Sequence, residues 1–494
     1  MKILKITALL VCFAIIFVFL GCSGKTEDGD NDSGPTEKTK EAPDENADPC
    51  NTDYLPEYNL GGKDFNIIAY GTTDGIGLSY YWAESEIGES LNDSMYKRNI
   101  AVEERFSLKL NFTILKDGDL SGRITSSILS DDRQYDLFAI HPAQYAQTML
   151  LNDYTVNWNN VASIDLEKPW WNQNIKKLLD INGYLPFMVS DFVFPSIIHT
   201  FMMVYNKNLQ QSLGIESIYD LVDSGNWTFD KFCEIIRSVT LDLSGDGKMG
   251  VDDRYGYAAS DVWHSTALAY GIGIQAIEQN ENGYPEITLD KDGKPAKYLE
   301  TMRELFNSKT IYKKDSAEID LGIHNPISWD SDRIFIEATW LMKMPEMRNS
   351  ESDYGIIPFP KWDANQKQYH TFTDGRGSAL ALPMYSEDLE MAGSVAEALS
   401  AESRRTVLPA YFDSTLNTKF ARDEESIRMI QIILDGRVFD FGYMYRNPGE
   451  AITGCFQTLM GNSKSFAAHY ESNYDMWRAH FDGIYGKYEE LSQK

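Results

Sequence analysis

Oxygen-bearing side chains recur at alternate positions in one acidic stretch, residues 242–253. The spacing matches the twelve-residue calcium loop of the EF-hand type, in which a glycine permits a sharp turn and a last carboxylate closes the ring. Gly247 stands at the turn, and Gly250 would leave one place to a water. The sequence therefore predicts a structural Ca²⁺; the alternative is an acidic turn without metal. The predicted ligands are Asp242, Ser244, Asp246, the backbone carbonyl of Lys248, and Asp253.

A second set of residues could bind a ligand by stacking and hydrogen bonding. Sugar rings present apolar C–H faces that pack on flat aromatic surfaces, while their hydroxyls need polar partners. Each candidate has a structural alternative, because a tryptophan is more often part of a core and a charged loop residue is usually only solvated. The candidates lie in predicted loops or near predicted strand ends: Trp82, Gln144, Asp191, Trp263, Trp340 and Arg376.

Known catalytic motifs are absent from the sequence. It contains no H-E-x-x-H, no G-x-S-x-G and no G-x-x-x-x-G-K-[ST]. Gly271–Ala276 imitates a dinucleotide fingerprint but follows a helix-like stretch instead of the required strand. The chain is so acidic that it does not exclude a pair of catalytic carboxylates for glycoside hydrolysis, although no carboxylate sits in a recognisable motif. A formal charge of −29 argues against binding nucleic acid.

The elements that would position these residues begin with an alternation of strands and helices. Such an alternation predicts parallel strands joined by right-handed crossovers. Ligands bind beyond the carboxyl ends of strands in such sheets, which selects the loops 71–89 and 141–145. The predicted elements are a strand at 64–70, a helix from Ser90, a strand at 108–115, a helix at 120–129 and a strand at 135–140.

A second run of elements follows. After residue 383 the chain is predicted to be strongly helical, in four segments that reach the last residues. No repeat of fixed period occurs. The predicted elements are strands at 184–189, 201–205 and 353–358, and helices at 229–240, 296–306, 388–401, 403–412, 424–434 and from Ser465.

The first residues have the pattern of a lipoprotein signal. Lys2 and Lys5 precede an apolar run at 6–20, which is short for a membrane span. The run ends in Phe-Leu-Gly-Cys, which resembles the bacterial lipobox, although Phe19 stands where an aliphatic residue is usual. That resemblance implies acylation of Cys22, as with palmitate, and anchoring at the outer face of the cell membrane. An ordinary cleaved signal peptide is the alternative.

The segment after this cysteine is polar and acidic, and residues 22–57 are predicted to form a disordered tether. Three further cysteines, Cys50, Cys233 and Cys455, are widely spaced and contain no C-x-x-C pair. This excludes a disulfide-dense scaffold and a zinc ribbon, and favours isolated thiols over one long-range disulfide.

Landmarks along the chain resemble, in order, the extracellular solute-binding proteins of bacterial ABC importers, in particular the sugar-binding lipoproteins. No single landmark is decisive, but their order and spacing together are specific. They are GESLND from Gly88, RN at Arg98, VEERF from Val102, YDL from Tyr135, WWN from Trp170, VYNKNL from Val204, DYGIIPFPK from Asp353 and AEALS from Ala396.

The resemblance implies an α/β fold of two lobes of the type II periplasmic binding protein kind, which close by a hinge over a ligand. The expected division is a signal at 1–21, the tether at 22–57, the first lobe at 58–185, the second at 186–325, a return through the first lobe at 326–383, and a helical part at 384–494 mainly in the second lobe.

The function that the resemblance implies is non-enzymatic capture of a small solute, a mono- or oligosaccharide, for an ABC permease by a monomer. No organic cofactor is expected. A secreted glycan hydrolase and a surface adhesion or sensory protein are the alternatives.

Overall fold

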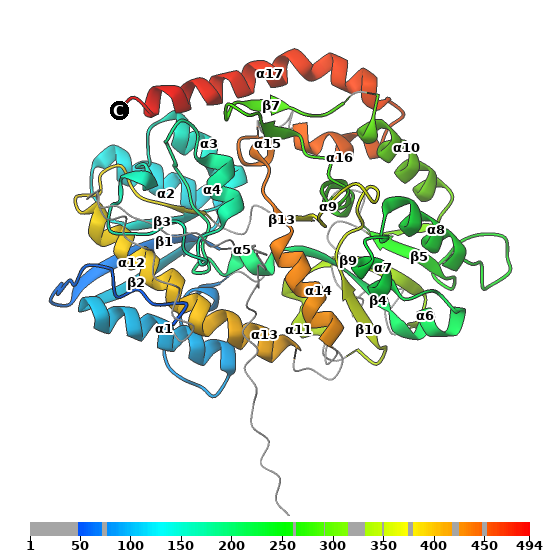
Figure 1. Cartoon of the computed structure of the whole chain (residues 1–494), viewed down its shortest axis with the longest axis horizontal. Helices are drawn as coiled ribbons and strands as arrows, with labels where there is room; N and C mark the ends of the chain where they lie inside the picture. Colours follow the sequence, from blue (N-terminus) through cyan, green and yellow to red (C-terminus); the bar gives the residue numbers. More distant parts are fainter. Residues whose placement is uncertain are drawn as a thin grey trace, which may run out of the picture. The chain divides into compact units, whose positions relative to one another are not determined.

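A computed structural model describes residues 48–71, 77–259, 263–290, 292–314, 331–347, 350–373, 379–416, 424–446 and 452–494. Pro49–Lys494 form one compact unit. Its two larger sheets lie apart from each other, each with helices beside it (Figure 1), and two two-stranded sheets complete the described strands. Among the described residues, no helix is long and apolar enough to cross a membrane.

The first sheet has the strand order β12-β3-β1-β2. β1 (Lys63–Tyr70) pairs in parallel with β2 (Leu108–Leu115) and with β3 (Leu137–Ile140), whereas β12 (Ala379–Ala381) is antiparallel to β3. α1 (Ser90–Phe106) and α2 (Asp117–Ser130) connect the parallel strands. The alternation predicted for residues 64–140 is therefore confirmed.

The second sheet has the order β10-β4-β9-β5-β8. All side chains of β4 and β9 are buried, which fits a sheet covered by helices on both faces. An added Cβ at Gly256 in β5 would overlap the backbone oxygen of Ile236, so glycine lets α8 approach this strand closely. The strands are β4 (Phe201–Asn206), β5 (Tyr255–Ala259), β8 (Ile311–Lys313), β9 (Ile334–Trp340) and β10 (Tyr354–Ile357).

The remaining elements lie between and around these sheets. Side-chain caps begin several of the helices; Asn206, for example, ends β4 and accepts a hydrogen bond from the backbone N–H of Leu209 in α6. The helices are α3 (Pro142–Leu151), α4 (Gln173–Leu179), α5 (Pro195–Ile198), α6 (Lys207–Leu213), α7 (Ile218–Asp223), α8 (Phe229–Val239), α9 (Trp263–Gly271), α10 (Lys294–Asn307) and α11 (Met344–Met347), and the short strands are β6 (Ile277–Gln279), β7 (Pro285–Ile287), β11 (Thr371–Phe372) and β13 (Arg437–Val438).

The C-terminal part contributes helices to both sheets. α12 packs against α1 beside the first sheet, α14 packs against β10 of the second, and α17 contacts both α3 and α10 (Figure 1). The predicted assignment of 384–494 mainly to the second lobe is therefore wrong. The helices are α12 (Leu389–Glu402), α13 (Leu408–Leu416), α14 (Glu424–Asp435), α15 (Phe441–Met444), α16 (Cys455–Met460) and α17 (Phe466–Leu491), with a π-helical turn at Ser403–Val407.

Two further expectations about the lobes need correction. Residues 326–383 do not return as a whole to the first lobe, because β9 and β10 both pair with β4, and only β12 joins the first sheet. The strand predicted at 184–189 is instead a stretch with isolated bridges, one of which joins Met188 to Leu380 of β12.

The N-terminal segment of the compact unit is ordered where the tether was predicted to reach residue 57. Cys50 and Leu55 are buried, Arg105 of α1 donates to the hydroxyl and carbonyl of Thr52, and Tyr54 donates a hydrogen bond to Glu397 of α12. The tether boundary was placed too late because these few apolar residues are enough to pack against α1 and α12. Residues 22–47 lie outside the described part.

Candidate functional site

Three stretches that link the two sheets can be located from the pairings at their ends. The first runs from Met188 to Phe201, the second from Phe372 to Ala379, and the third from β13, which pairs with β11, to α15, which packs against α3. Thr373 bridges Thr200 at the start of β4, and six residues later Ala379 pairs with Ile140. Six residues span at most about 20 Å, so the carboxyl end of β3 lies close to the edge of the second sheet where β4 begins.

The edge of the first sheet brings a histidine and a tyrosine together. His141 follows β3 directly and is buried, and its ring lies 5.0 Å from the ring of Tyr70 at the end of β1. Its Nδ1 is 2.9 Å from Oδ1 of Asp117, while Nε2 is buried without a hydrogen-bond partner among the described residues. This nitrogen could therefore bind a polar group that enters from the edge.

The facing edge of the second sheet is aromatic. Trp340, the last residue of β9, is 4% exposed and lies 5.1 Å from Phe201, the first residue of β4, between ring centroids. The His264 ring is 6.2 Å from Trp340. Nε1 of Trp340 is a buried donor without an acceptor in the described part of the chain. A ligand with both an apolar face and an acceptor oxygen would suit this edge.

A buried ion pair lies in the same sheet. Lys314, which follows β8, contacts Glu337 of β9, and the two side chains are 1% and 2% exposed. Burial, together with the positive charge of Lys314, lowers the pKa of His264 to about 3, so this imidazole is neutral at physiological pH. The second sheet's edge therefore presents a neutral aromatic surface to a ligand. The charges buried behind it, on Lys314 and Glu337, compensate each other.

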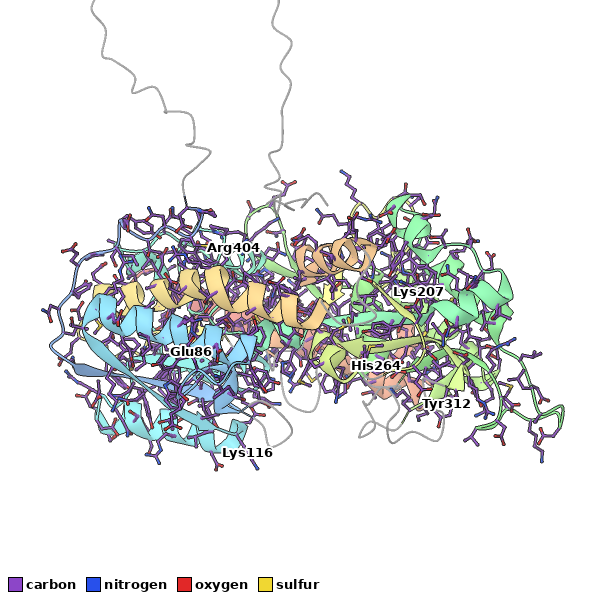
Figure 2. All side chains as sticks on the ribbon, turned by 90° about the horizontal axis from the view of Figure 1, so that it is seen from below. Glu86, Lys116, Lys207, His264, Tyr312 and Arg404 are labelled. Atoms are coloured by element: carbon purple, nitrogen blue, oxygen red, sulfur yellow. The ribbon has the colours of Figure 1, made fainter. Side chains whose placement is uncertain are left out.

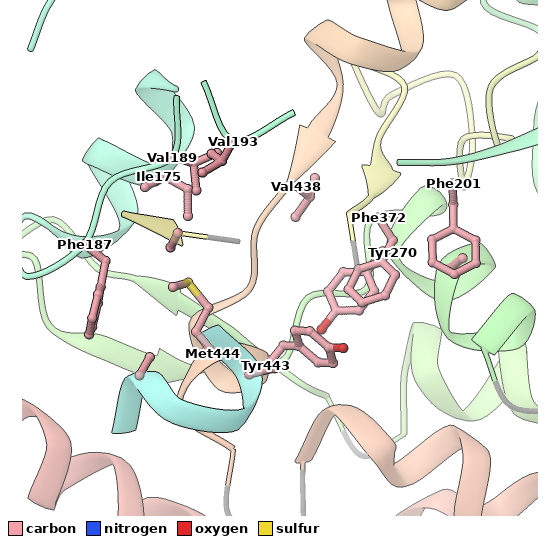
Figure 3. Close-up of a cluster of buried hydrophobic side chains, with 14 of the residues drawn as sticks. Ile175, Phe187, Val189, Val193, Phe201, Tyr270, Phe372, Val438, Tyr443 and Met444 are labelled. Carbon is pink, nitrogen blue, oxygen red and sulfur yellow. The ribbon is translucent and has the colours of Figure 1, made fainter. Parts of the chain in front are cut away.

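An aromatic layer connects this edge to the crossovers (Figure 3). Phe372 stacks on Tyr270 at 4.7 Å and on Phe201 at 5.6 Å, and Tyr443 meets Phe372 edge-on at 5.2 Å. Val438 of β13 lies between this layer and the aliphatic cluster that contains Val189 (Figure 3). The described parts of the crossovers are thus packed in hydrophobic surroundings.

The structure brings together only some of the residues predicted to bind ligand. Trp340 and Trp263, the partly buried first residue of α9, are on the second sheet's edge, and Gln144 is exposed in the first turn of α3, close to His141. Arg376 lies outside the described residues. His141, Tyr70, Phe201 and His264 were not predicted; the position of His141 directly after a buried strand was a usable signal.

Two predicted residues lie elsewhere. Trp82 lines a pocket of about 600 Å³ between α1 and the edge strand β2, together with Tyr96 and Asn111. Asp191 lines a groove in which its Oδ2 accepts a hydrogen bond of 2.9 Å from Arg404. Neither residue therefore shares the strand-end edges with Trp340 and His141.

The carboxylates of the acidic loop at 242–253 accept hydrogen bonds from the loop itself. Asp253 is buried and accepts from the backbone N–H groups of Leu243, Ser244 and Gly250, and these bonds lower its pKa. Asp242 accepts from the amide N–H groups of Gly245 and Gly247, and Asp246 from that of Lys248. The described residues contain no group of three acidic, histidine or cysteine side chains that could hold a metal. The calcium site remains a prediction from spacing.

Cys50, Cys233 and Cys455 are buried and form no disulfide among the described residues, in agreement with the isolated thiols that the cysteine spacing favoured. Burial raises the pKa of the Cys233 thiol to about 12 and that of Cys455 to about 12. A thiol that stays protonated is a poor nucleophile, so these two cysteines act as core residues.

Comparisons with known proteins agree with this geometry. Residues 91–323, just under half of the chain, match the family model described as bacterial extracellular solute-binding protein. No curated protein sequence gives a significant match. The resemblance predicted from the sequence landmarks is therefore confirmed.

Solved structures show the same fold at low sequence identity. The galacto-N-biose-/lacto-N-biose I-binding protein of an ABC transporter from Bifidobacterium longum has a TM-score of 0.56 at 12% identity, covering 85% of this chain and 98% of its own. The GacH receptor of Streptomyces glaucescens, solved with acarbose, gives 0.55 at 11%, covering 85% and 99%. An extracellular solute-binding protein from Staphylococcus aureus, solved with maltose, gives 0.54 at 12%, covering 85% and 97%. The predicted two-lobed α/β fold of periplasmic binding proteins is confirmed.

Proposed function

We propose that this protein is an extracellular solute-binding lipoprotein that captures a mono- or oligosaccharide for an ABC-type importer, without catalysis. The observation that carries the proposal is the pair of facing strand-end edges. One presents the aromatic surface of Trp340 and its buried Nε1 donor, and the other presents His141 with an unpartnered Nε2. Apolar surface beside buried donors suits a ring that carries both C–H faces and hydroxyl oxygens.

The family match and the sugars in the names of the similar structures support this choice of ligand class. Two lobes linked by several stretches of chain also suit closure over a solute, which is a hinge motion. The family match supports delivery to a permease, and the lipobox-like sequence before Cys22 supports residence at the outer face of the membrane.

Ligand-dependent stabilisation tests the binding proposal. A panel of mono- and oligosaccharides, with short peptides as controls, should contain at least one sugar that raises the melting temperature, because a ligand that binds only the folded state stabilises it. Isothermal titration should then give a saturable heat with that sugar, and incubation should return the sugar uncleaved. A folded sample that responds to no sugar, or that responds only to peptides, would refute the carbohydrate assignment.

The anchor is tested separately in cells. Metabolic labelling with palmitate should mark the wild-type protein and leave a Cys22→Ala variant unlabelled, and the variant should leave the membrane fraction. Equal labelling of both proteins would refute the lipidation site without affecting the solute-binding proposal.

The predicted calcium ion in the loop 242–253 has its own test. Calcium added to protein stripped with a chelator should raise the melting temperature, and Asp242→Asn should remove that increase, because the aspartate would supply the first ligand. Asp363→Asn, in a loop elsewhere, is the matched control. An increase that Asp242→Asn leaves unchanged would exclude this loop as the site.

A further inference from the structure

A groove of about 460 Å³ lies beside the crossovers, away from the strand-end edges. Figure 2 shows Arg404, which lines the groove, toward the face of the molecule opposite to Lys116, the residue after β2. The groove is bounded by α4, by the crossover at Asp191, by the π-helical turn before α13, and by α14 with β13. It belongs neither to the solute site proposed above nor to the pocket at Trp82.

Two arginines form the polar part of this groove. Arg404 donates from Nη1 to Oδ2 of Asp191 at 2.9 Å and to the carbonyl of Pro169 at 3.0 Å. Arg437 donates from Nε to the carbonyl of Leu434 at 3.2 Å, but its Nη1 is buried without a partner among the described residues. The groove thus contains a buried guanidinium whose hydrogen bonds are incomplete.

Donors exceed acceptors around these guanidinium groups. Each arginine has five N–H donors and no acceptor. The carboxylates in the groove are Asp191, already bonded to Arg404, and Asp435, which accepts from Gln431 at 2.7 Å. Nε1 of Trp171 is a further buried donor without a described acceptor in a residue that lines the same groove. A ligand that brings only acceptors would complete this set.

The backbone at Arg404 and the burial of Arg437 also favour an anion in this groove. Arg404 sits in the π-helical turn Ser403–Val407, a rare interruption of helices that frequently occurs at functional sites. Burial, with a smaller contribution from the charge of Arg404, lowers the pKa of Arg437, although Asp191 and Asp435 oppose the shift. A neighbouring anion would relieve the cost of burying this charge.

We propose that this groove is a second binding site, which takes a small ligand bearing a carboxylate or phosphate group between Arg437 and Arg404. Planar guanidinium groups bind both anions through paired hydrogen bonds. Asn174 of α4 donates to the carbonyl of Arg437 at 2.9 Å, so the groove joins the first sheet's helices to a crossover strand.

Titration of the purified protein with inorganic phosphate and with citrate, each at constant ionic strength set with sodium chloride, tests the site without any sugar. Isothermal titration should show saturable binding of at least one anion, and comparing the two distinguishes a phosphate from a carboxylate ligand. Arg437→Gln should weaken that binding about tenfold or more, because a charged hydrogen bond is lost. Arg428→Gln is the matched control, since Arg428 lies on α14, the helix just before β13, but pairs with Asp223 outside the groove at 2.6 Å.

The outcomes separate clearly. No saturable heat with either anion overturns the proposal, and so does equal weakening in Arg437→Gln and Arg428→Gln, which would show non-specific binding. If Arg437→Gln does not fold, Arg404→Gln replaces it, because the Arg404 side chain is 41% exposed and tolerates change. Failure of the sugar panel would leave this result untouched, since no sugar is present.

Discussion

Two ion pairs on different sides of the crossovers show how differently the same chemistry is used. Lys314 and Glu337 are sealed inside the second sheet, with side chains 1% and 2% exposed. Arg404 and Asp191 are 41% and 11% exposed and line an open groove. The first pair has little water to replace either partner, whereas the head group of Arg404 is partly hydrated.

The difference in exposure between the two ion pairs indicates which kind of ligand suits the strand-end edges and which suits the groove. At the strand-end edges the charge is compensated internally, so the surface left for a ligand is aromatic and neutral. In the groove the guanidinium groups keep unused donors, so the ligand favoured there is an anion. Substitutions that alter one charge at a time can confirm or break this contrast.

Removal of the sealed carboxylate should have the largest effect. Glu337→Gln takes away the charge that compensates the buried ammonium of Lys314, which typically costs about 3–5 kcal/mol of folding free energy. Urea denaturation measures this loss. The double variant Glu337→Leu, Lys314→Met should recover much of it, because no buried charge is left. A Glu337→Gln protein as stable as wild type would show that the pair is not sealed.

Glu397, a buried carboxylate without an ion-pair partner among the described residues, should make stability depend on pH. Burial raises the pKa of Glu397 to about 7, despite hydrogen bonds from Tyr54 and from the Asp165 amide. The folded state therefore binds more protons than the unfolded state between about pH 4.5 and 7, and stability should fall as the pH rises through that window by about 2–3 kcal/mol.

Glu397→Gln should remove this decline, measured by urea denaturation at pH 5 and pH 7.5. Glu390→Gln on the same helix is the control of opposite sign. Burial pushes the pKa of Glu390 up, but hydrogen bonds from Ser163 and Ala162 lower it overall. That control should lower the stability at both pH values and leave the decline between them nearly unchanged, because the stability that a lowered pKa supplies is lost only below about pH 4.5. Parallel pH profiles for Glu397→Gln and wild type would contradict the expectation.

Removal of the indole at the aromatic edge should affect binding more than folding. Trp340→Phe keeps a ring against Phe201 but removes the Nε1 donor, and we expect sugar affinity to fall about tenfold. Trp227→Phe is the matched control, since its Nε1 donates to the carbonyl of Pro358 in the core. Titration with the sugar found in the panel measures both. Equal losses in the two variants would remove Trp340 from the site.

Breaking the partly exposed ion pair between Arg404 and Asp191 should have the smallest effect on stability. Asp191→Asn leaves Arg404 in contact with water, so the loss in urea denaturation should stay within about 1 kcal/mol. The same variant should bind the anion more tightly than wild type, because a competing carboxylate has gone. A large loss of stability would show that the Arg404–Asp191 pair behaves like the buried Lys314–Glu337 pair. It would therefore contradict the proposed difference between the two pairs.

Much of the fold could be predicted from the sequence because its signals are local. The first strands and helices show apolar periodicities of two and of about four residues, and β2 was predicted at the bounds observed. Strand pairing is not local. β9 and β10 join β4 across more than a hundred residues of sequence, and no single-residue pattern indicates this choice.

The candidate site was harder to predict for the same reason. Trp340 was found because it ends a strand, yet nothing near Asp191 in the sequence indicates that Arg404, 213 residues later, will bind it. His141 was missed in favour of Gln144, because which residue of a loop points inward depends on packing against Tyr70 and Asp117.

The connectivity of the two sheets also sets an order in which they can be completed during synthesis. Every strand of the second sheet lies between Phe201 and Ile357, so that sheet is available as soon as this stretch has emerged. The first sheet must wait for Ala379–Ala381, because β12 is made more than two hundred residues after its neighbour β3. The half that starts the chain is thus the last to be finished, and a nascent polypeptide exposes the unpaired edge of β3 until then.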